Sequence, residues 1–406
     1  MIIRRYDHQR DRDSLLRVFR EVGWVGKEKE KEPFFDSFVS ASRGFVAEQD
    51  GAAECGVLMY RATMRFQDGE LPFAGVASVT TSRVARRQGL AGRTTATALA
   101  DAALRGAAVA GLGMFDQGYY NQLGFGTMAY DHWVTFDPAT LRVPVRARPP
   151  VRISAEDAAA VHAGRLARLR PHGGVNFHDD TFTRTAMQEA DNGFGLGYRD
   201  GGRISHHFWA EAKGESGPYN VWWLAYESTD QLVELLALLH DLSDQVHHLH
   251  MKEPAQIQVQ DLLEWPFRNR SRSSRAEHEH RMWSNADSQA RILNLPACIA
   301  AVRARGEPAF NLNLHDPVAR YLPEDGWQGV GGEYVVRLGA ASSAEPGSAP
   351  DLPVLSAGVG AFTRLWLGVR PAVSLAVTDD LSGPPDLLAA IDNALALPVP
   401  HFDWIF

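Results

Sequence analysis

The sequence predicts a mixed α/β (α+β) fold built as three successive domains. The chain has 406 residues, of which 45% are hydrophobic and 22% charged, so each of two or three domains is large enough to bury its own core. Prolines between residues 143 and 150 interrupt the chain after a first series of strands and helices. A similar series follows this break. We therefore expect domains at residues 1–146, 147–291 and 292–406.

The first domain alternates strand-like and helix-like segments. Residues 12–22 carry apolar side chains at helical spacing, whereas residues 44–67 contain short apolar runs separated by Asp-Gly turns. An alanine-rich segment then follows a longer apolar strand. The expected order is a strand at residues 2–3, a helix at 12–22, strands at 44–47, 55–61, 63–67 and 71–79, a helix at 91–104 and a strand at 107–115.

The second domain partly repeats this order, and the third differs from both. The second should contain strands before a helix with leucines on one face. The third combines one clear strand with two short helices, which makes it an α+β domain. The expected elements are strands at 194–198, 203–212 and 219–226, a helix at 231–242, a strand at 333–338, and helices at 361–367 and 386–395.

A basic, glycine-containing turn lies between a strand and a helix of the first domain. Its core is Arg86-Arg87-Gln88-Gly89-Leu90-Ala91. Backbone N–H groups at a helix start are unpaired, glycine allows close approach, and arginines add positive charge, so a pyrophosphate fits such a turn. Taken alone, the turn also fits a basic surface loop that caps a helix.

A second motif follows downstream at residues 119–126, Tyr-Tyr-Asn-Gln-Leu-Gly-Phe-Gly. Together the two motifs resemble the acyl-CoA-binding signature and the Tyr-x-x-x-Gly-Phe segment of the GNAT superfamily of N-acetyltransferases. In that resemblance Tyr120 is the general acid, since a phenol with a pKa near ~10 stays protonated at neutral pH. Tyr119 is the alternative general acid. A purely structural role, in which these aromatic rings only pack around a glycine-rich turn, is the other interpretation.

The resemblance implies acetyl-CoA as cosubstrate, held by the strand before the turn, by the turn itself and by the start of the helix. Backbone N–H groups of the strand would bind the thioester oxygen. The expected coenzyme contacts are Ala77, Ser78, Val79, Val84, Arg86, Arg87, Gln88, Gly89, Leu90 and Ala91.

Over its whole length the sequence resembles the enhanced intracellular survival (Eis) family: two tandem GNAT-like domains and a sterol-carrier-protein-like domain. The resemblance implies a hexamer, and an α-carboxylate at Phe406 acting as general base from within the active site. The apolar end, with Phe402, Trp404 and Phe406, suits burial. A tail docked only as a hydrophobic anchor is the alternative. The family pattern has an acidic residue before the last aromatic, whereas this sequence has Ile405, so Asp403 is the expected substitute.

The resemblance also implies a small polycationic amine, such as an aminoglycoside-like antibiotic, as acceptor. Trp24, Phe34, Asp36 and Asp403 are the expected acceptor contacts, through ring faces and carboxylates. An aromatic helix pair packed inward, with Asp36 in solvent, is the alternative. Acylation of a protein lysine or another biosynthetic amine remains open, as does a lipid-binding protein with a vestigial transferase domain.

Composition excludes several classes. The 41 basic and 49 acidic residues give a net charge of −8, which argues against nucleic acid and mildly favours cationic ligands. No apolar run reaches the ~18 residues of a membrane span, and no signal sequence is apparent, so we expect a cytoplasmic protein. The histidine clusters at 206–207, 247–250 and 278–280 match no known ligand spacing, so no metal is expected.

Overall fold

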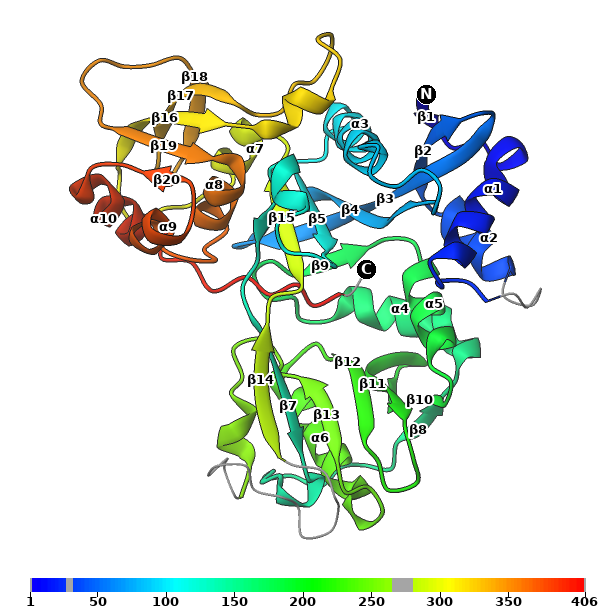
Figure 1. The fold of residues 1–406 in the computed structure, drawn as a ribbon. Helices are drawn as coiled ribbons and strands as arrows, with labels where there is room; N and C mark the ends of the chain where they lie inside the picture. Colours follow the sequence, from blue (N-terminus) through cyan, green and yellow to red (C-terminus); the bar gives the residue numbers. More distant parts are fainter. Residues whose placement is uncertain (1, 27–31, 265–279, 405–406) are drawn as a thin grey trace. The chain divides into compact units, whose positions relative to one another are not determined.

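A computed structural model describes residues 2–26, 32–264 and 280–404. The chain forms two compact units (Figure 1). The first comprises residues 1–129, 172–177 and 287–406, and the second comprises residues 130–171 and 178–286. Each unit is described by itself.

The first unit contains an eight-stranded mixed sheet. Its strands are antiparallel except for β4 and β5, which run parallel on either side of helix α3 in the sequence. The order is β1 (Ile2–Arg5), β2 (Arg43–Gln49), β3 (Ala52–Phe66), β4 (Gly69–Thr81), β5 (Val109–Gly113), β15 (Ser288–Ile292) and β6 (Gly126–Thr127), with β9 (Val175–Phe177) paired to β3. Its helices are α1 (His8–Glu21), α2 (Glu32–Ser40) and α3 (Leu90–Leu104).

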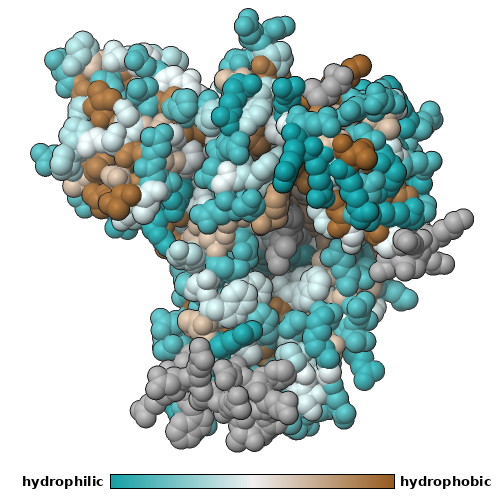
Figure 2. Space-filling model, in the orientation of Figure 1, coloured by the Kyte–Doolittle hydropathy of each residue, from teal (hydrophilic) through white to brown (hydrophobic). Residues whose placement is uncertain are grey.

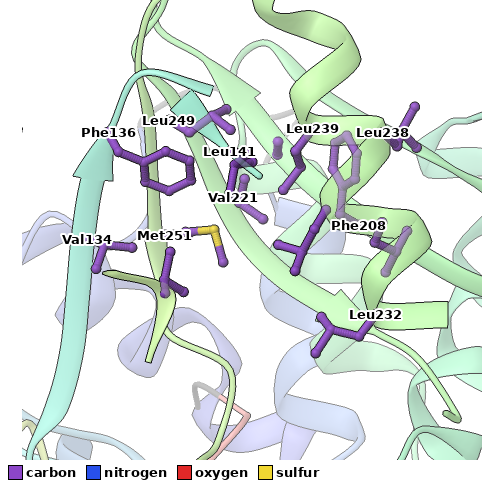
Figure 3. Close-up of a cluster of buried hydrophobic side chains, with 14 of the residues drawn as sticks. Val134, Phe136, Leu141, Phe208, Val221, Leu232, Leu238, Leu239, Leu249 and Met251 are labelled. Atoms are coloured by element: carbon purple, nitrogen blue, oxygen red, sulfur yellow. The ribbon is translucent and has the colours of Figure 1, made fainter. Parts of the chain in front are cut away.

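The second unit repeats this arrangement in a seven-stranded sheet. Strands β12 and β13 are its parallel pair, and α6 lies between them in the sequence. The order is β8 (Val151–Ile153), β10 (Gly193–Asp200), β11 (Arg203–Ala212), β12 (Tyr219–Ala225), β13 (Leu249–Lys252), β7 (Asp131–Phe136) and β14 (Arg281–Asn285). The helices are α4 (Ala158–Ala167), α5 (Thr181–Glu189) and α6 (Thr229–Asp241). Figure 3 shows the core beneath α6, where Val134 and Phe136 of β7 gather with Leu249 and Met251 of β13.

Each sheet contains an inserted strand that comes from a distant part of the chain. In the first sheet β15 lies between β5 and β6, and at the corresponding place in the second sheet β7 lies between β13 and β14. Residues 131–136, assigned by sequence to the first domain, thus form a strand of the second sheet. Residues 288–291, assigned to the second domain, lie in the first. The three-domain division at 146 and 291 stays a prediction.

The C-terminal part of the first unit carries a five-stranded sheet. The two helices predicted here, at 361–367 and 386–395, start and end within two residues of their predicted positions, whereas the helices at Leu295–Ala300 and Ala372–Thr378 were not predicted. The strand order is β18 (Ser343–Pro346), β17 (Gly332–Arg337), β16 (Ala309–His315), β19 (Val354–Gly358) and β20 (Leu381–Ser382). The helices are α7 (Leu295–Ala300), α8 (Val359–Trp366), α9 (Ala372–Thr378) and α10 (Pro385–Ala394), and η7 (Pro317–Tyr321) is a single 3₁₀ turn.

Local signals account for the boundaries that differ from the prediction. Helix α1 begins at His8 rather than residue 12, because the Asp7 side chain accepts hydrogen bonds from Gln9 and Arg10 N–H and caps the helix. The strands predicted at 55–61 and 63–67 are one strand, β3, and the following turn is formed by Gln67 and Asp68 rather than by Asp68-Gly69. The prediction of a mixed α/β fold is confirmed.

The surface is largely hydrophilic on the face shown in Figure 2, with separate apolar patches. Among the exposed apolar residues are Val373 and Val377 of α9. Within the described part of the chain, no helix is both long and apolar enough to cross a bilayer.

Candidate functional site

Strands β4 and β5 separate before β4 ends. They pair only from Phe73–Val109 to Val76–Leu112, whereas β4 continues to Thr81. Its ladder with β3 shifts between Leu58–Ala77 and Gly56–Thr80, so Ser78 lies in a bulge, with the positive φ of 52° that non-glycine residues rarely adopt. Past Val76, the peptide groups of β4 that face β5 have no partner in that strand and remain available to a ligand.

The basic turn joins the end of β4 to the start of α3. Glu21 at the end of α1 holds its first part, because a Glu21 carboxylate oxygen accepts the Arg83 N–H at 2.7 Å and the Arg83 guanidinium donates to the Glu21 carbonyl at 2.9 Å. This backbone hydrogen bond lowers the pKa of Glu21. Arg87 and Gly89 adopt φ of 62° and 74°, and α3 begins directly after Gly89. The turn thus presents the N-terminus of a long helix beside arginines.

A pocket of about 660 Å³ lies over this turn and the free end of β4. Its size lies within the range of small-molecule sites. A Cβ at Gly89 would meet no atom within 4 Å, so the space above this glycine is open to a ligand. Six of the predicted coenzyme residues line the pocket: Val79, Arg86, Arg87, Gly89, Leu90 and Ala91.

The other predicted coenzyme residues lie outside the lining. Ala77 and Ser78 precede it on β4, and Val84 is exposed on the turn, where its carbonyl accepts a hydrogen bond from Gln88. The pocket also has walls that the sequence did not indicate. These are Val22, Thr80, Thr81, Ala85 and Phe115.

The two candidate tyrosines differ in exposure. Tyr120 starts a 3₁₀ turn, η2 (Tyr120–Leu123), and is 3% exposed; Tyr119 lines the pocket. Their rings pack edge to face, 4.9 Å between centroids. Burial raises the pKa of Tyr120 well above its usual range and the pKa of Tyr119 to about 12. Both phenols therefore hold their proton at neutral pH.

The C-terminal tail returns to the first sheet. It leaves α10 and runs toward β9 (Figure 1), where Val175 N–H donates to an Asp403 carboxylate oxygen at 3.1 Å. Phe402 packs edge to face on Phe73 of β4, 5.8 Å between centroids, and Trp404 packs on Phe177 in the same way at 5.9 Å. The tail is thus anchored on β4 and β9 of the first sheet. Phe406 and Ile405 lie outside the described residues.

The predicted acceptor residues differ in their exposure, in their partners and in whether they line the pocket. Trp24 is 53% exposed and lines the pocket, whereas Phe34 is 37% exposed on α2 and is absent from that lining. Both Asp36 oxygens accept hydrogen bonds from Arg12 at 2.8 Å. Because Arg12 already neutralises this carboxylate, Asp36 offers a weaker attraction to a cation than the sequence indicated. Asp403 accepts the Val175 N–H described above.

The turn between β12 and α6 of the second sheet differs from the basic turn between β4 and α3. Between β12 and α6 the chain has only residues 226–228, and Ser228 caps the helix by accepting the Gln231 N–H at 3.3 Å. The Glu227 N–H is bound by the Gln231 side chain at 2.6 Å. Glu227 in this turn and Asp230 in the first turn of α6 are acidic, whereas the first sheet has arginines before its helix. Capped N–H groups and carboxylates disfavour a pyrophosphate there.

The histidine clusters have other partners. His206 is hydrogen-bonded to Glu234 at 3.0 Å, His207 accepts the Trp223 indole N–H at 3.2 Å, and His250 is hydrogen-bonded to Thr135. Across residues 2–26, 32–264 and 280–404 no three His, Cys, Asp or Glu side chains gather in a way that would hold a metal. His278 lies outside the described residues.

The N-terminal part of the chain is similar to a known protein family. Residues 4–128 match the family model of an acetyltransferase (GNAT) domain. This segment contains α1, the β2–β4 meander, the basic turn, α3, β5, η2 and β6. All residues that line the pocket fall within this matched segment. A comparison with curated proteins finds no match.

Solved structures share the fold over the full length of the chain. They include a conserved protein of unknown function from Enterococcus faecalis V583, described as a probable N-acyltransferase (TM-score 0.82, 16% identity, 100% of this chain and 99% of that one). Eis1 from Mycobacterium abscessus is similarly close (TM-score 0.79, 16% identity, 100% of both chains). A GCN5-related N-acetyltransferase from Kribbella flavida has a TM-score of 0.75 at 18% identity, over 100% and 98% of the two chains. These likenesses confirm the predicted fold class.

Proposed function

We propose that the protein is an acetyl-CoA-dependent N-acetyltransferase whose acceptor is an amine of a small polycationic molecule. The observation that carries this proposal is the pocket over the basic turn, which combines a helix N-terminus, two arginines and the unpaired end of β4. The diphosphate of coenzyme A suits the turn, and its peptide-like arm suits the free β4 edge, where it can add as a short extra strand. A transferase activity is in keeping with the GNAT domain match.

The chemistry follows from these groups. The amine nitrogen attacks the thioester carbonyl carbon, its oxygen is stabilised by N–H groups of β4 near the Ser78 bulge, and the C–S bond breaks. The departing thiolate takes a proton from Tyr120, and the former amine loses a proton to a base. Phe406, through its carboxylate, is the proposed base, and the anchoring of residues 402–404 against the first sheet supports its delivery to this domain.

Two features support a cationic acceptor. The chain has a net charge of −8, which raises the local concentration of cations. Trp24 offers an exposed indole at the pocket, and a ring face attracts an ammonium group. That Eis1 is among the similar structures is consistent with an Eis-like enzyme. Accordingly an aminoglycoside-like antibiotic is the proposed acceptor class, with the hexamer and the sterol-carrier-like third domain as further proposals.

Lipid binding by the third domain is less well supported as the main function than acetyl transfer. A cavity between α8 and α10, lined by Leu365, Val369 and Leu397 among others, has a volume of about 300 Å³. This volume is at the lower end of the range for small-molecule pockets.

Acetyl-CoA cleavage measured with a panel of polyamines and aminoglycosides tests the proposal. We expect turnover with at least one of them, a loss of about 10²- to 10⁴-fold in kcat in Tyr120→Phe, and little change in Tyr119→Phe. A loss of kcat in Tyr119→Phe alone would assign the general acid to Tyr119 instead. Acetylation of protein lysines with no small-molecule product, seen by mass spectrometry, would refute the acceptor class. Absence of acetyl-CoA binding would refute the whole proposal.

A further inference from the structure

A buried ion pair lies behind the turn that carries Tyr120. Arg291 of β15 and Asp316, just before η7, have side chains that are 0% and 1% exposed, and their nearest atoms are 2.6 Å apart. Both Asp316 oxygens are also used, since Oδ1 accepts the Val318 N–H at 3.1 Å and Oδ2 accepts the Val330 N–H at 2.9 Å. The carboxylate is thus fixed by the C-terminal part of the chain, and it fixes the guanidinium in turn.

The guanidinium reaches from this pair to the Tyr120 turn. Arg291 Nη1 donates a hydrogen bond to the carbonyl of Leu123, the last residue of η2. A carbonyl at the end of a helical turn lacks a partner within that turn, and an arginine supplies one. Burying an ion pair is expensive, and well-packed apolar residues often replace one without loss of stability. The pair is therefore better explained by the directed bond to Leu123 than by stability.

Neighbouring residues hold the rest of the same turn. Gln289, two residues before Arg291 on β15, donates to Asn121 Oδ1 at 3.0 Å. Tyr321 of η7 donates to Gln122 Oε1 at 3.3 Å. Each residue of η2 after Tyr120 is thus hydrogen-bonded by a side chain from β15 or η7.

The glycine that follows η2 fits against α8. Gly124 has φ of +80°, and a Cβ there would lie 2.4 Å from Val359 Cγ1 and 3.0 Å from Arg291 Nη1. The Gly-Phe-Gly sequence after Tyr120 therefore allows close packing against the C-terminal part of the chain. This packing, together with the hydrogen bonds above, holds η2 against β15, η7 and α8.

We infer that Arg291 and Asp316 are positioning residues for Tyr120, and that Gln289 assists them, so that β15 and the C-terminal domain set where the catalytic phenol lies. This inference rests on the proposed function. Displacement of a reacting group by about 1 Å lowers rates by about 10²-fold, and the phenol is attached to a turn whose other residues are held from outside. Acetyl-CoA binding is unaffected in this account, because none of these residues lines the pocket.

The test compares Arg291→Lys and Gln289→Met with a control outside η2. Lys keeps the charge beside Asp316 but cannot bond to Asp316 and Leu123 with the arginine fork. Gln289→Met is close in shape and also removes a side-chain oxygen that has no hydrogen-bond partner, so it should fold. Asp392→Asn, which weakens the hydrogen bonds that the Ala372 and Val373 N–H groups at the start of α9 donate to the Asp392 carboxylate, is the control for a general loss of stability.

We expect kcat to fall about 10- to 100-fold in Arg291→Lys and Gln289→Met, with KM for acetyl-CoA changed less than about two-fold. Asp392→Asn should lower the Tm and leave kcat unchanged. The decisive readout is a double-mutant cycle: in a Tyr120→Phe background, Arg291→Lys should lower kcat by less than about two-fold further.

The outcomes separate the two proposals. If Tyr120→Phe leaves kcat unchanged, the proposed acid is wrong and so is this inference. If Tyr120→Phe lowers kcat but both β15 variants keep full activity, or act additively with it, the proposed function stands and the inference is overturned.

Discussion

Replacement of Gly89 by alanine should change both the stability of the protein and its affinity for acetyl-CoA, and the two effects can be measured separately. Gly89 has φ of 74° and open space where a Cβ would lie. Left-handed backbone costs an alanine about 1–2 kcal/mol, partly offset by the lower entropy of the unfolded chain. We therefore expect Gly89→Ala to lower the free energy of unfolding by about 1 kcal/mol.

The effect on acetyl-CoA should be larger. The new methyl group would occupy the space through which the diphosphate approaches the N–H groups at the start of α3. Loss of one hydrogen bond to a charged group amounts to about 1.5–3 kcal/mol, so the Kd for acetyl-CoA should rise about 10- to 100-fold. Isothermal titration measures the Kd, and urea denaturation measures the stability.

Gly51→Ala is the matched control. Gly51, in the turn between β2 and β3, has φ of 85° and likewise no atom within 4 Å of an added Cβ, but it does not line the pocket. It should lose the same stability and keep the wild-type Kd. An equal Kd in Gly89→Ala and Gly51→Ala would refute the assignment of this turn as the diphosphate site.

Three further predictions concern pH, the acceptor and the tail. Burial lowers the pKa of His207 to about 3, so below a pH of about 6.5 the unfolded chain takes up a proton that the folded chain does not, and the free energy of unfolding should fall by up to about 1.4 kcal/mol per pH unit between about 6.5 and 3. Urea denaturation at several pH values should show a shallower dependence of this free energy on pH in His207→Phe. An identical dependence in the two proteins would contradict this. Trp24→Ala should raise the KM for the amine about 10-fold, whereas Asp36→Asn, whose carboxylate is already paired, should change it less than about three-fold; steady-state kinetics showing the reverse order would restore Asp36 as the main contact. Phe402→Ala, which loosens the tail while retaining Phe406, should reduce kcat as strongly as deletion of Phe406, and a fully active Phe402→Ala would show that anchoring is dispensable.

Local patterns in the sequence located the basic turn and the helix that follows it. Alanine-rich composition indicated α3 and leucine spacing indicated α6, and the Arg86-x-x-Gly89 turn was found because its residue types carry their own conformational and charge requirements. The difference between Tyr119 and Tyr120 was not accessible in this way, because neighbouring residues on a 3₁₀ turn differ only in which side of the turn they occupy.

Non-local pairing explains the parts that were missed. Strand β15 inserts between β5 and β6, more than 150 residues away in sequence, and no short-range signal specifies that partner. The Asp36 carboxylate appeared free because Arg12 lies one helix earlier in the chain. Likewise, Gly124 was predicted only as part of the Tyr-x-x-x-Gly-Phe segment, whereas the structure adds a packing reason for it, because a Cβ there would collide with Val359.

The number of acetyl-CoA molecules bound per chain tests the account most directly. The open basic turn after β4 and the capped, acidic turn after β12 together predict a calorimetric stoichiometry of one, with a higher Kd for that one molecule in Gly89→Ala. Binding of two molecules per chain, or one molecule that is indifferent to Gly89, would contradict the account.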